Sequence, residues 1–244
     1  MADSDITLDD IAAVLDRRGY IYLPSPALQE VVGWNSEQWS GFAASWDRLG
    51  DDRFMADGGR YRRRRHAAFE ASAERLRCKV HQPHFQSRDY NPLNGDVQRW
   101  FDPVENGIAQ CEILQSIFRS LTPFFAKLDN HEPTGSWHSE MHQIRIETSP
   151  RELGRPTPEG LHRDGVDWVL VMLIARKNVE DGVTEIGDPD GQRLGRFTLT
   201  RPGDAVILDD RRIRHGVTPI RAMSDTEPAY RDALVLTWKA SLAA

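Results

Sequence analysis

Apolar residues recur at helical spacing in three stretches of the first half of the chain. These stretches predict helices over about 6–18, 39–49 and 106–121, because residues three and four positions apart share one face of a helix. Pro123 has no backbone N–H to donate within a helix, so we expect it to end or kink the third helix. A short strand is predicted at 20–23, directly before a proline.

The pattern changes after Trp137. Short segments rich in Val, Ile, Leu and Thr alternate there with turns rich in Gly, Pro and Asp. Many short strands without intervening helices are typical of an antiparallel sandwich, jelly roll or barrel. The predicted strands cover about 137–147, 167–175, 195–200, 204–209, 212–218 and 231–239.

Together the two halves predict an α+β protein. Helices within about 1–130 would serve as buttress and lid, and they would pack on a β core of about 137–240. No linker rich in Gly, Pro or Ser separates the halves, so we expect one domain over 1–244.

Composition narrows the class of protein. The chain has 244 residues, with 31 Lys and Arg against 37 Asp and Glu, and the net charge of −6 argues against a general nucleic-acid binder. The longest apolar run, 168–175, is far shorter than the roughly 20 residues of a membrane span. The acidic N-terminus does not resemble a signal peptide, and the two cysteines exclude a disulfide framework. We therefore expect a cytoplasmic protein.

Candidate metal ligands lie at the start of the predicted strand 167–175. His162 and Asp164 are two residues apart, so in an extended chain both side chains point to the same face. His215 is predicted on a later strand, and an antiparallel roll would bring that strand back alongside the first. Two imidazoles and one carboxylate form the facial triad of non-haem iron oxygenases. Zinc accepts the same ligands, so the residues alone leave the metal open.

Arg231 is the second candidate. It shares a strand face with Ala233 and Val235, so an inward-facing Arg231 would place a guanidinium in an apolar interior. Such a buried charge needs an anionic partner, and a bound carboxylate would satisfy it through two hydrogen bonds. An ion pair with a nearby aspartate, such as Asp232, is the alternative.

A competing cluster lies on one predicted strand, where His138, Glu140 and His142 alternate. Residues four positions apart in a strand are separated by about 13 Å, so the two histidines cannot share one small ion. Glu140 with one neighbour stays open as a site if further ligands come from elsewhere. On the opposite face, Gln143 and Arg145 are candidates for substrate binding if that face is the inner one.

Two further segments have two interpretations each. Arg60 and the run 62–65 form a cationic cluster, which is either a patch for nucleic acid or an anionic substrate, or a set of ion pairs with one arginine turned toward the pocket. The turn-rich loop 90–95 is either a lid or connecting chain.

The segments 156–168, 208–215 and 230–232 resemble the 2-oxoglutarate/Fe(II)-dependent dioxygenases. Within that family they are most similar to the bacterial branch of free amino acid hydroxylases typified by L-isoleucine 4-hydroxylase. The specific motifs cover about 156–238, and weaker similarity reaches back to about 60. The sequence departs from the family pattern at Gly182, where two adjacent glycines are expected.

The resemblance implies a double-stranded β-helix, a cupin-like jelly roll. It implies Fe(II) on His162, Asp164 and His215, and 2-oxoglutarate on Arg231, with O2 as co-substrate. The implied reaction is hydroxylation of an aliphatic C–H bond in a small polar substrate, by resemblance a free L-amino acid, whose carboxylate would meet Arg145 or an arginine of 60–65. The alternative function is a cupin-like metal protein, either a small-molecule sensor or a zinc or iron hydrolase or isomerase. We expect no nucleic-acid or membrane partner, and a homo-oligomer is left open.

Overall fold

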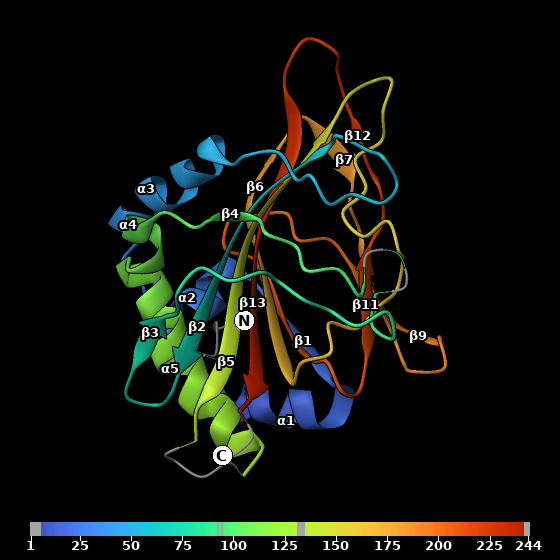
Figure 1. The fold of residues 1–244 in the computed structure, drawn as a ribbon. Helices are drawn as coiled ribbons and strands as arrows, with labels where there is room; N and C mark the ends of the chain where they lie inside the picture. The colour runs from blue at the N-terminus through green and yellow to red at the C-terminus, as the bar shows by residue number, and fades with distance from the viewer. Residues whose placement is uncertain (1–5, 92, 94, 131–134, 242–244) are drawn as a thin grey trace.

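The residues that the structure describes form three sheets. Figure 1 shows how the strands and helices are arranged. The computed structural model describes residues 6–91, 93, 95–130 and 135–241. In these residues the largest sheet has eight strands, with β4 (Asp102–Pro103) beside β2 and the others in the order β1 (Tyr20–Leu23), β10 (Ala205–Asp209), β6 (Trp168–Lys177), β13 (Ala229–Ala240), β5 (Trp137–Thr148), β2 (Arg62–Ala71) and β3 (Leu76–Cys78).

Two small sheets complete the roll. The first has the order β11 (Arg214–Val217), β8 (Thr184–Gly187) and β9 (Arg193–Phe197), and the second pairs β12 (Ile220–Ala222) with β7 (Val179–Asp181). The pairs joining β1, β10, β6, β13, β5 and β2 are all antiparallel. The six strands predicted after Trp137 are confirmed within a few residues at each end.

The N-terminal half adds two strands beside the core strands of the large sheet. At one edge β1 confirms the strand predicted at 20–23, whereas the ten-residue β2 beside β5 was not expected. Its inward positions carry Arg62, Arg64 and His66, so the alternation of apolar and polar residues that marks a strand is missing.

The helices lie on one side of the large sheet. They are α1 (Leu8–Arg18), α2 (Ser25–Val32), α3 (Trp39–Ala43), α4 (Asn106–Ala109) and α5 (Glu112–Leu128), with 3-10 turns at Ser36–Gln38 and Ala44–Arg48. We expected Pro123 to end or kink the third helix. It does not end the helix, because α5 continues to Leu128. Phe124 and Phe125 are buried after the proline, and their packing holds the last turn.

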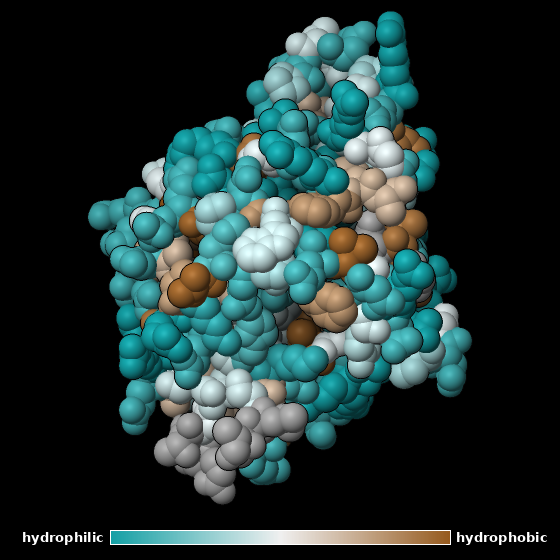
Figure 2. Space-filling model, viewed as in Figure 1, coloured by the Kyte–Doolittle hydropathy of each residue, from teal (hydrophilic) through white to brown (hydrophobic). Residues whose placement is uncertain are grey.

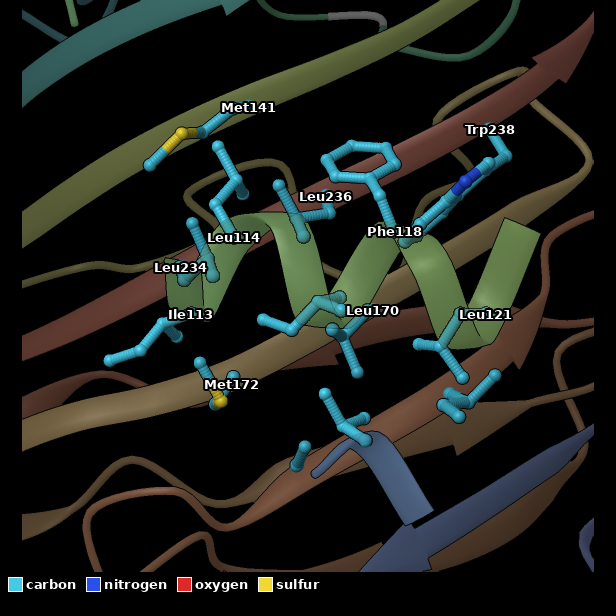
Figure 3. Packing of buried hydrophobic residues seen from close by; sticks show 14 of the residues in the cluster. Ile113, Leu114, Phe118, Leu121, Met141, Leu170, Met172, Leu234, Leu236 and Trp238 are labelled. Carbon is cyan, nitrogen blue, oxygen red and sulfur yellow. The ribbon is translucent and has the colours of Figure 1, made fainter. Parts of the chain in front are cut away.

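The core lies between α5 and the large sheet (Figure 3). Leu114, Phe118 and Leu121 of α5 face Leu170 of β6 and Leu236 of β13, and all five are buried. Each such side chain contributes about 1.5–3 kcal/mol to stability. Because side chains alternate along a strand, the other face of the same strands is free to build a site. Among the described helices, none combines the length and the hydropathy of a membrane-spanning segment.

Candidate active site

A cavity of about 340 Å³ lies on the face of the large sheet that the helices leave uncovered. Strands β2, β5, β6 and β13 supply one wall, and β11 with the segment around 156–166 supplies another. The segment between β3 and β4 crosses the front of the large sheet toward β11 (Figure 1). In Figure 2 apolar side chains gather around a hollow near the middle of this largely hydrophilic face.

His162, Asp164 and His215 meet in this cavity. His162 and His215 are joined by two backbone hydrogen bonds of 3.0 and 2.9 Å, which align their side chains. The Nε2 atom of His162 lies 3.7 Å from Oδ1 of Asp164, and Nε2 of His215 lies 3.5 Å from Oδ2. The three ligand atoms lie within 4.8 Å of one another. The structure thus brings together the predicted triad.

The protonation states suit a metal. Nδ1 of His162 lies 3.1 Å from the Gly160 carbonyl and donates to it, which leaves the Nε2 lone pair facing Asp164. Burial and the neighbouring His162 lower the pKa of His215 to about 4, so this imidazole is neutral. Burial opposes protonation of His162, but the carboxylates of Asp164 and Glu159 outweigh it and raise the pKa of His162. The site therefore attracts a cation.

Asp210 holds the loop that carries Asp164. Its carboxylate accepts hydrogen bonds from the backbone N–H groups of Asp164, Gly165 and Val166 at 2.9, 2.8 and 3.2 Å. The Asp210 side chain is fully buried, and burial together with Asp164 raises its pKa to about 6. The neighbouring Asp209 has a different role and forms an ion pair with Arg211 at 2.9 Å.

Arg231 enters the same cavity from β13. Its side chain faces inward with Ala233 and Val235, as the alternation predicted, and it is 3% exposed. Burial and the nearby Arg176 lower the pKa of Arg231 to about 10, so it remains a cation at neutral pH. Nε and Nη2 have no hydrogen-bond partner among the described residues, and none of their carboxylates forms an ion pair with Arg231, not even that of Asp232. The cavity therefore holds an uncompensated positive charge.

A second cluster of potential ligands lines the cavity. Glu140 and His142 of β5 meet His66 of β2 and His84, with one ligand atom of each within 4.8 Å of the others. His138 is near as well, with Nε2 3.5 Å from Glu140 Oε1. As the strand geometry required, Glu140 and its β5 neighbour His142 are joined by further ligands from other segments. The two histidines that β2 and the β3–β4 segment bring were not predicted.

Gln143 and Arg145 lie on the opposite face of β5, so the prediction that they bind substrate needs correction. Gln143 donates to Ser45 at 2.8 Å on the helical side of the sheet. Arg145 is held by Asp232 at 2.7 Å and Asp47 at 2.8 Å. Neither side chain lines the cavity, because the inner face of β5 carries the even-numbered residues.

The arginine cluster divides between ion pairs and the cavity. Arg63 pairs with Glu147 at 2.8 Å on the surface, whereas Arg62 and Arg64 turn inward. Arg62 is paired with Asp52 at 2.6 Å. Sequence reasoning missed Arg99, which is also buried in the cavity wall.

The loop 90–95 borders the cavity through Tyr90 and Asn91, while residues 92 and 94 lie outside the described residues. Gln86 ties the same segment to the triad, because its side-chain amide donates to the Asp164 carbonyl at 3.2 Å. No motif in the sequence pointed to Gln86, since its role depends on a contact 78 residues away.

Comparison with known proteins decides the family. The model of the family described as 2OG-Fe dioxygenase matches residues 43–237, well over half of the chain. The chain belongs to this dioxygenase family. Members of the family use Fe(II), 2-oxoglutarate and O2, so the predicted enzyme class and cofactors are confirmed, and the alternative of a cupin-like sensor, hydrolase or isomerase is not favoured.

Several relatives resemble this dioxygenase. The 3(1)-hydroxy-L-isoleucine 4-dioxygenase of Pantoea ananatis is 22% identical over 94% of this chain and 95% of its own length. The L-isoleucine-4-hydroxylase of Bacillus thuringiensis is 24% identical over 64% of each chain.

Solved structures share the fold. A bsmA homolog from Methylobium petroleophilum superimposes with a TM-score of 0.88 at 35% identity, covering 97% of this chain and 94% of its own. IDO from Bacillus thuringiensis gives 0.79 at 18% identity, covering 96% and 99%. The jelly-roll core with N-terminal helices is therefore confirmed for this dioxygenase.

Proposed function

We propose that this dioxygenase hydroxylates an aliphatic carbon of a free L-amino acid. In this proposal His162, Asp164 and His215 hold Fe(II), and Arg231 binds the distal carboxylate of 2-oxoglutarate. The observation that carries the assignment is the buried Arg231, which has no acidic partner among the described residues and faces the same cavity as the triad. A dicarboxylate that reaches the metal at one end supplies the missing anion at the other.

The donor set fits the metal. Two imidazole nitrogens and a carboxylate face one point, and their separations of 3.5 and 3.7 Å are too long for hydrogen bonds and leave space for an ion. Fe(II) with 2-oxoglutarate and O2 supplies oxidative decarboxylation to succinate and CO2 and the oxygen atom that enters the C–H bond. Asp210 and Gln86 keep Asp164 in place. No separate acid or base from the chain is required.

The substrate class rests on the relatives and on the lining of the cavity. Two relatives are named for hydroxylation or dioxygenation of isoleucine or a hydroxylated isoleucine. Apolar side chains of Val171, Val217 and Val235 line part of the cavity, and they suit an aliphatic side chain. The remaining wall is polar and charged, which suits the α-substituents.

Binding under anaerobic conditions tests the metal and co-substrate assignments. We expect Fe(II) with 2-oxoglutarate to give a metal-to-ligand charge-transfer band in the wild type and none in His162→Ala. Arg231→Met should raise the Kd for 2-oxoglutarate by about tenfold or more, since a charged hydrogen bond is worth about 1.5–3 kcal/mol. The Kd of Arg231→Lys for 2-oxoglutarate should lie between those of the wild type and Arg231→Met. A wild-type band that persists in His162→Ala would refute the ligand assignment.

The partner of this dioxygenase in the proposed reaction is a small molecule. A cytoplasmic location and the oligomeric state stay predictions, and gel filtration with light scattering measures the latter.

A further inference from the structure

Two cavity arginines besides Arg231 are buried without an acidic partner among the described residues. Arg64 is 9% exposed and Arg99 2% exposed. Nη2 of Arg64 lies 2.8 Å from Nδ1 of His142, and its guanidinium lies 4.3 Å from the centre of the Phe101 ring. Nε of each arginine has no hydrogen-bond partner within the described part of the chain. Burial lowers the pKa of Arg64 to about 9, so the side chain remains charged at neutral pH and needs an anion.

The carboxylate of Glu140 lies near these cations, and the imidazole of His142 separates it from Arg64. Glu140 accepts a 2.6 Å hydrogen bond from Nδ1 of His84. Nε2 of His142 and Nε2 of His66 each lie 3.4 Å from a Glu140 oxygen. Burial alone would raise the pKa of Glu140, but His84 and the other imidazoles outweigh it and hold the pKa well below its usual value. Glu140 is therefore an anion with acceptor capacity to spare.

The tautomer of His142 argues against a second metal at this cluster. An arginine can only donate, so Nδ1 of His142 must accept from Arg64. Burial and Arg64 hold the pKa of His142 well below its usual value, so the neutral ring carries its one proton on Nε2, toward Glu140. That nitrogen then has no lone pair for an ion. A metal would in addition lie next to the unpaired charges of Arg64 and Arg99.

We infer that this wall is a clamp for a zwitterion, in which Arg64 and Arg99 bind the α-carboxylate of the substrate and Glu140 binds its α-ammonium group. A single imidazole ring, that of His142, lies between Arg64 and Glu140. The α-carboxylate and the α-ammonium group of an amino acid are likewise close to each other, since one carbon atom joins them. The inference rests on the proposed function and deepens it. The enzyme would accept free α-amino acids and reject N-acylated, amidated or peptide-bound residues.

The cavity wall carries charges of both signs. Glu159 is a further carboxylate of the wall, and its Oε2 has no hydrogen-bond partner among the described residues. Lys239 adds a cation to the same wall, whereas Arg62 is already neutralised by Asp52. A zwitterion can meet a partner for each of its charges there, whereas a simple carboxylate or amine can meet partners of one sign only.

Equilibrium binding tests the clamp without turnover. The enzyme loaded anaerobically with Fe(II) and 2-oxoglutarate is titrated by calorimetry with the standard free L-amino acids. Each one that binds is then compared with its N-acetyl and carboxamide forms. We expect both derivatives to bind at least about tenfold more weakly, because each removes a charged partner.

Variants assign each charge to a residue. In Arg64→Met the free acid and its carboxamide should bind about equally, and in Glu140→Gln the free amine and its N-acetyl form should bind about equally. A merely structural defect would weaken all forms alike. Arg63→Met is the matched control, since Arg63 lies next in the strand but pairs with Glu147 on the surface. It should bind like the wild type.

The outcomes separate this inference from the proposed function. Binding of no free amino acid would overturn both. Binding of a free amino acid that the derivatives match, or that both variants leave unchanged, would overturn the clamp alone. Metal analysis that finds a second ion per chain, lost in Glu140→Gln, would assign the cluster to a metal and would also overturn the clamp.

Discussion

Buried charges decide the chemistry of this protein residue by residue. Arg231 and Arg64 face the cavity without acidic partners among the described residues, whereas Arg145, equally charged and close in the fold, is fully paired. An unpaired buried charge is costly, so a fold retains it where a ligand completes it. The pairing of each arginine therefore separates binding roles from structural ones.

Arg145→Met tests that distinction. Arg145 pairs with Asp232 and Asp47 and lies 4.1 Å from the centre of the Tyr230 ring. Removing it leaves the buried Asp232 without its partner, and we expect a loss of about 3 kcal/mol in the free energy of unfolding. The affinity for 2-oxoglutarate should not change. Denaturant unfolding measures the free energy of unfolding, and calorimetry measures the affinity for 2-oxoglutarate. Weaker binding of 2-oxoglutarate with unchanged stability would contradict the structural role of Arg145.

At the scale of elements, the sequence predicted the strands that present apolar residues to the helices. It did not predict β2, because the cavity gives that strand charged inward positions. The triad was predictable since His162 and Asp164 are two residues apart and His215 lies on a recognisable strand. His66, His84 and Arg99 were not, because only tertiary contacts bring them to Glu140 and Arg64.

The β3–β4 segment positions the metal loop through Tyr90. Gly165 has φ +78°, and a Cβ there would lie 2.5 Å from the Tyr90 ring. We expect Gly165→Ala to weaken Fe(II) binding about tenfold, since it displaces the neighbouring Asp164. Tyr90→Ala combined with Gly165→Ala should recover part of the loss, because the collision is removed and the positive φ remains.

A matched control separates backbone strain from the collision. Gly191 has φ +89°, with no atom within 4 Å of an added Cβ. Gly191→Ala should cost similar stability and leave the Fe(II) affinity unchanged. Equal metal affinities in Gly165→Ala and the wild type, measured by titration of the charge-transfer band, would refute the positioning role of this contact.

Over the whole molecule, the helices and the large sheet share one core, which includes residues of α1, α5, β6 and β13. We therefore expect a single cooperative unfolding transition, as the prediction of one domain requires. The other face of the same sheet carries the Glu140 cluster. Protonation of its histidines should therefore change the free energy of unfolding of the whole molecule.

Acid should destabilise the metal-free protein. Burial lowers the pKa of His84 to about 4, below its ordinary value, so the unfolded chain binds a proton that the folded chain does not. The free energy of unfolding should then fall as the pH drops from about 6.5 to about 4, by up to about 1.4 kcal/mol per pH unit for this group. His84→Gln should flatten the slope. An identical slope in wild type and variant would contradict the assignment.

Product formation tests the central claim most directly. The enzyme is incubated with Fe(II), 2-oxoglutarate, O2 and each standard free L-amino acid in turn, and succinate and oxygenated product are quantified by mass spectrometry. We predict that one or a few aliphatic amino acids give succinate and a monohydroxylated product in equal amounts, and that His162→Ala gives neither. Succinate formation that no free amino acid stimulates would contradict the account.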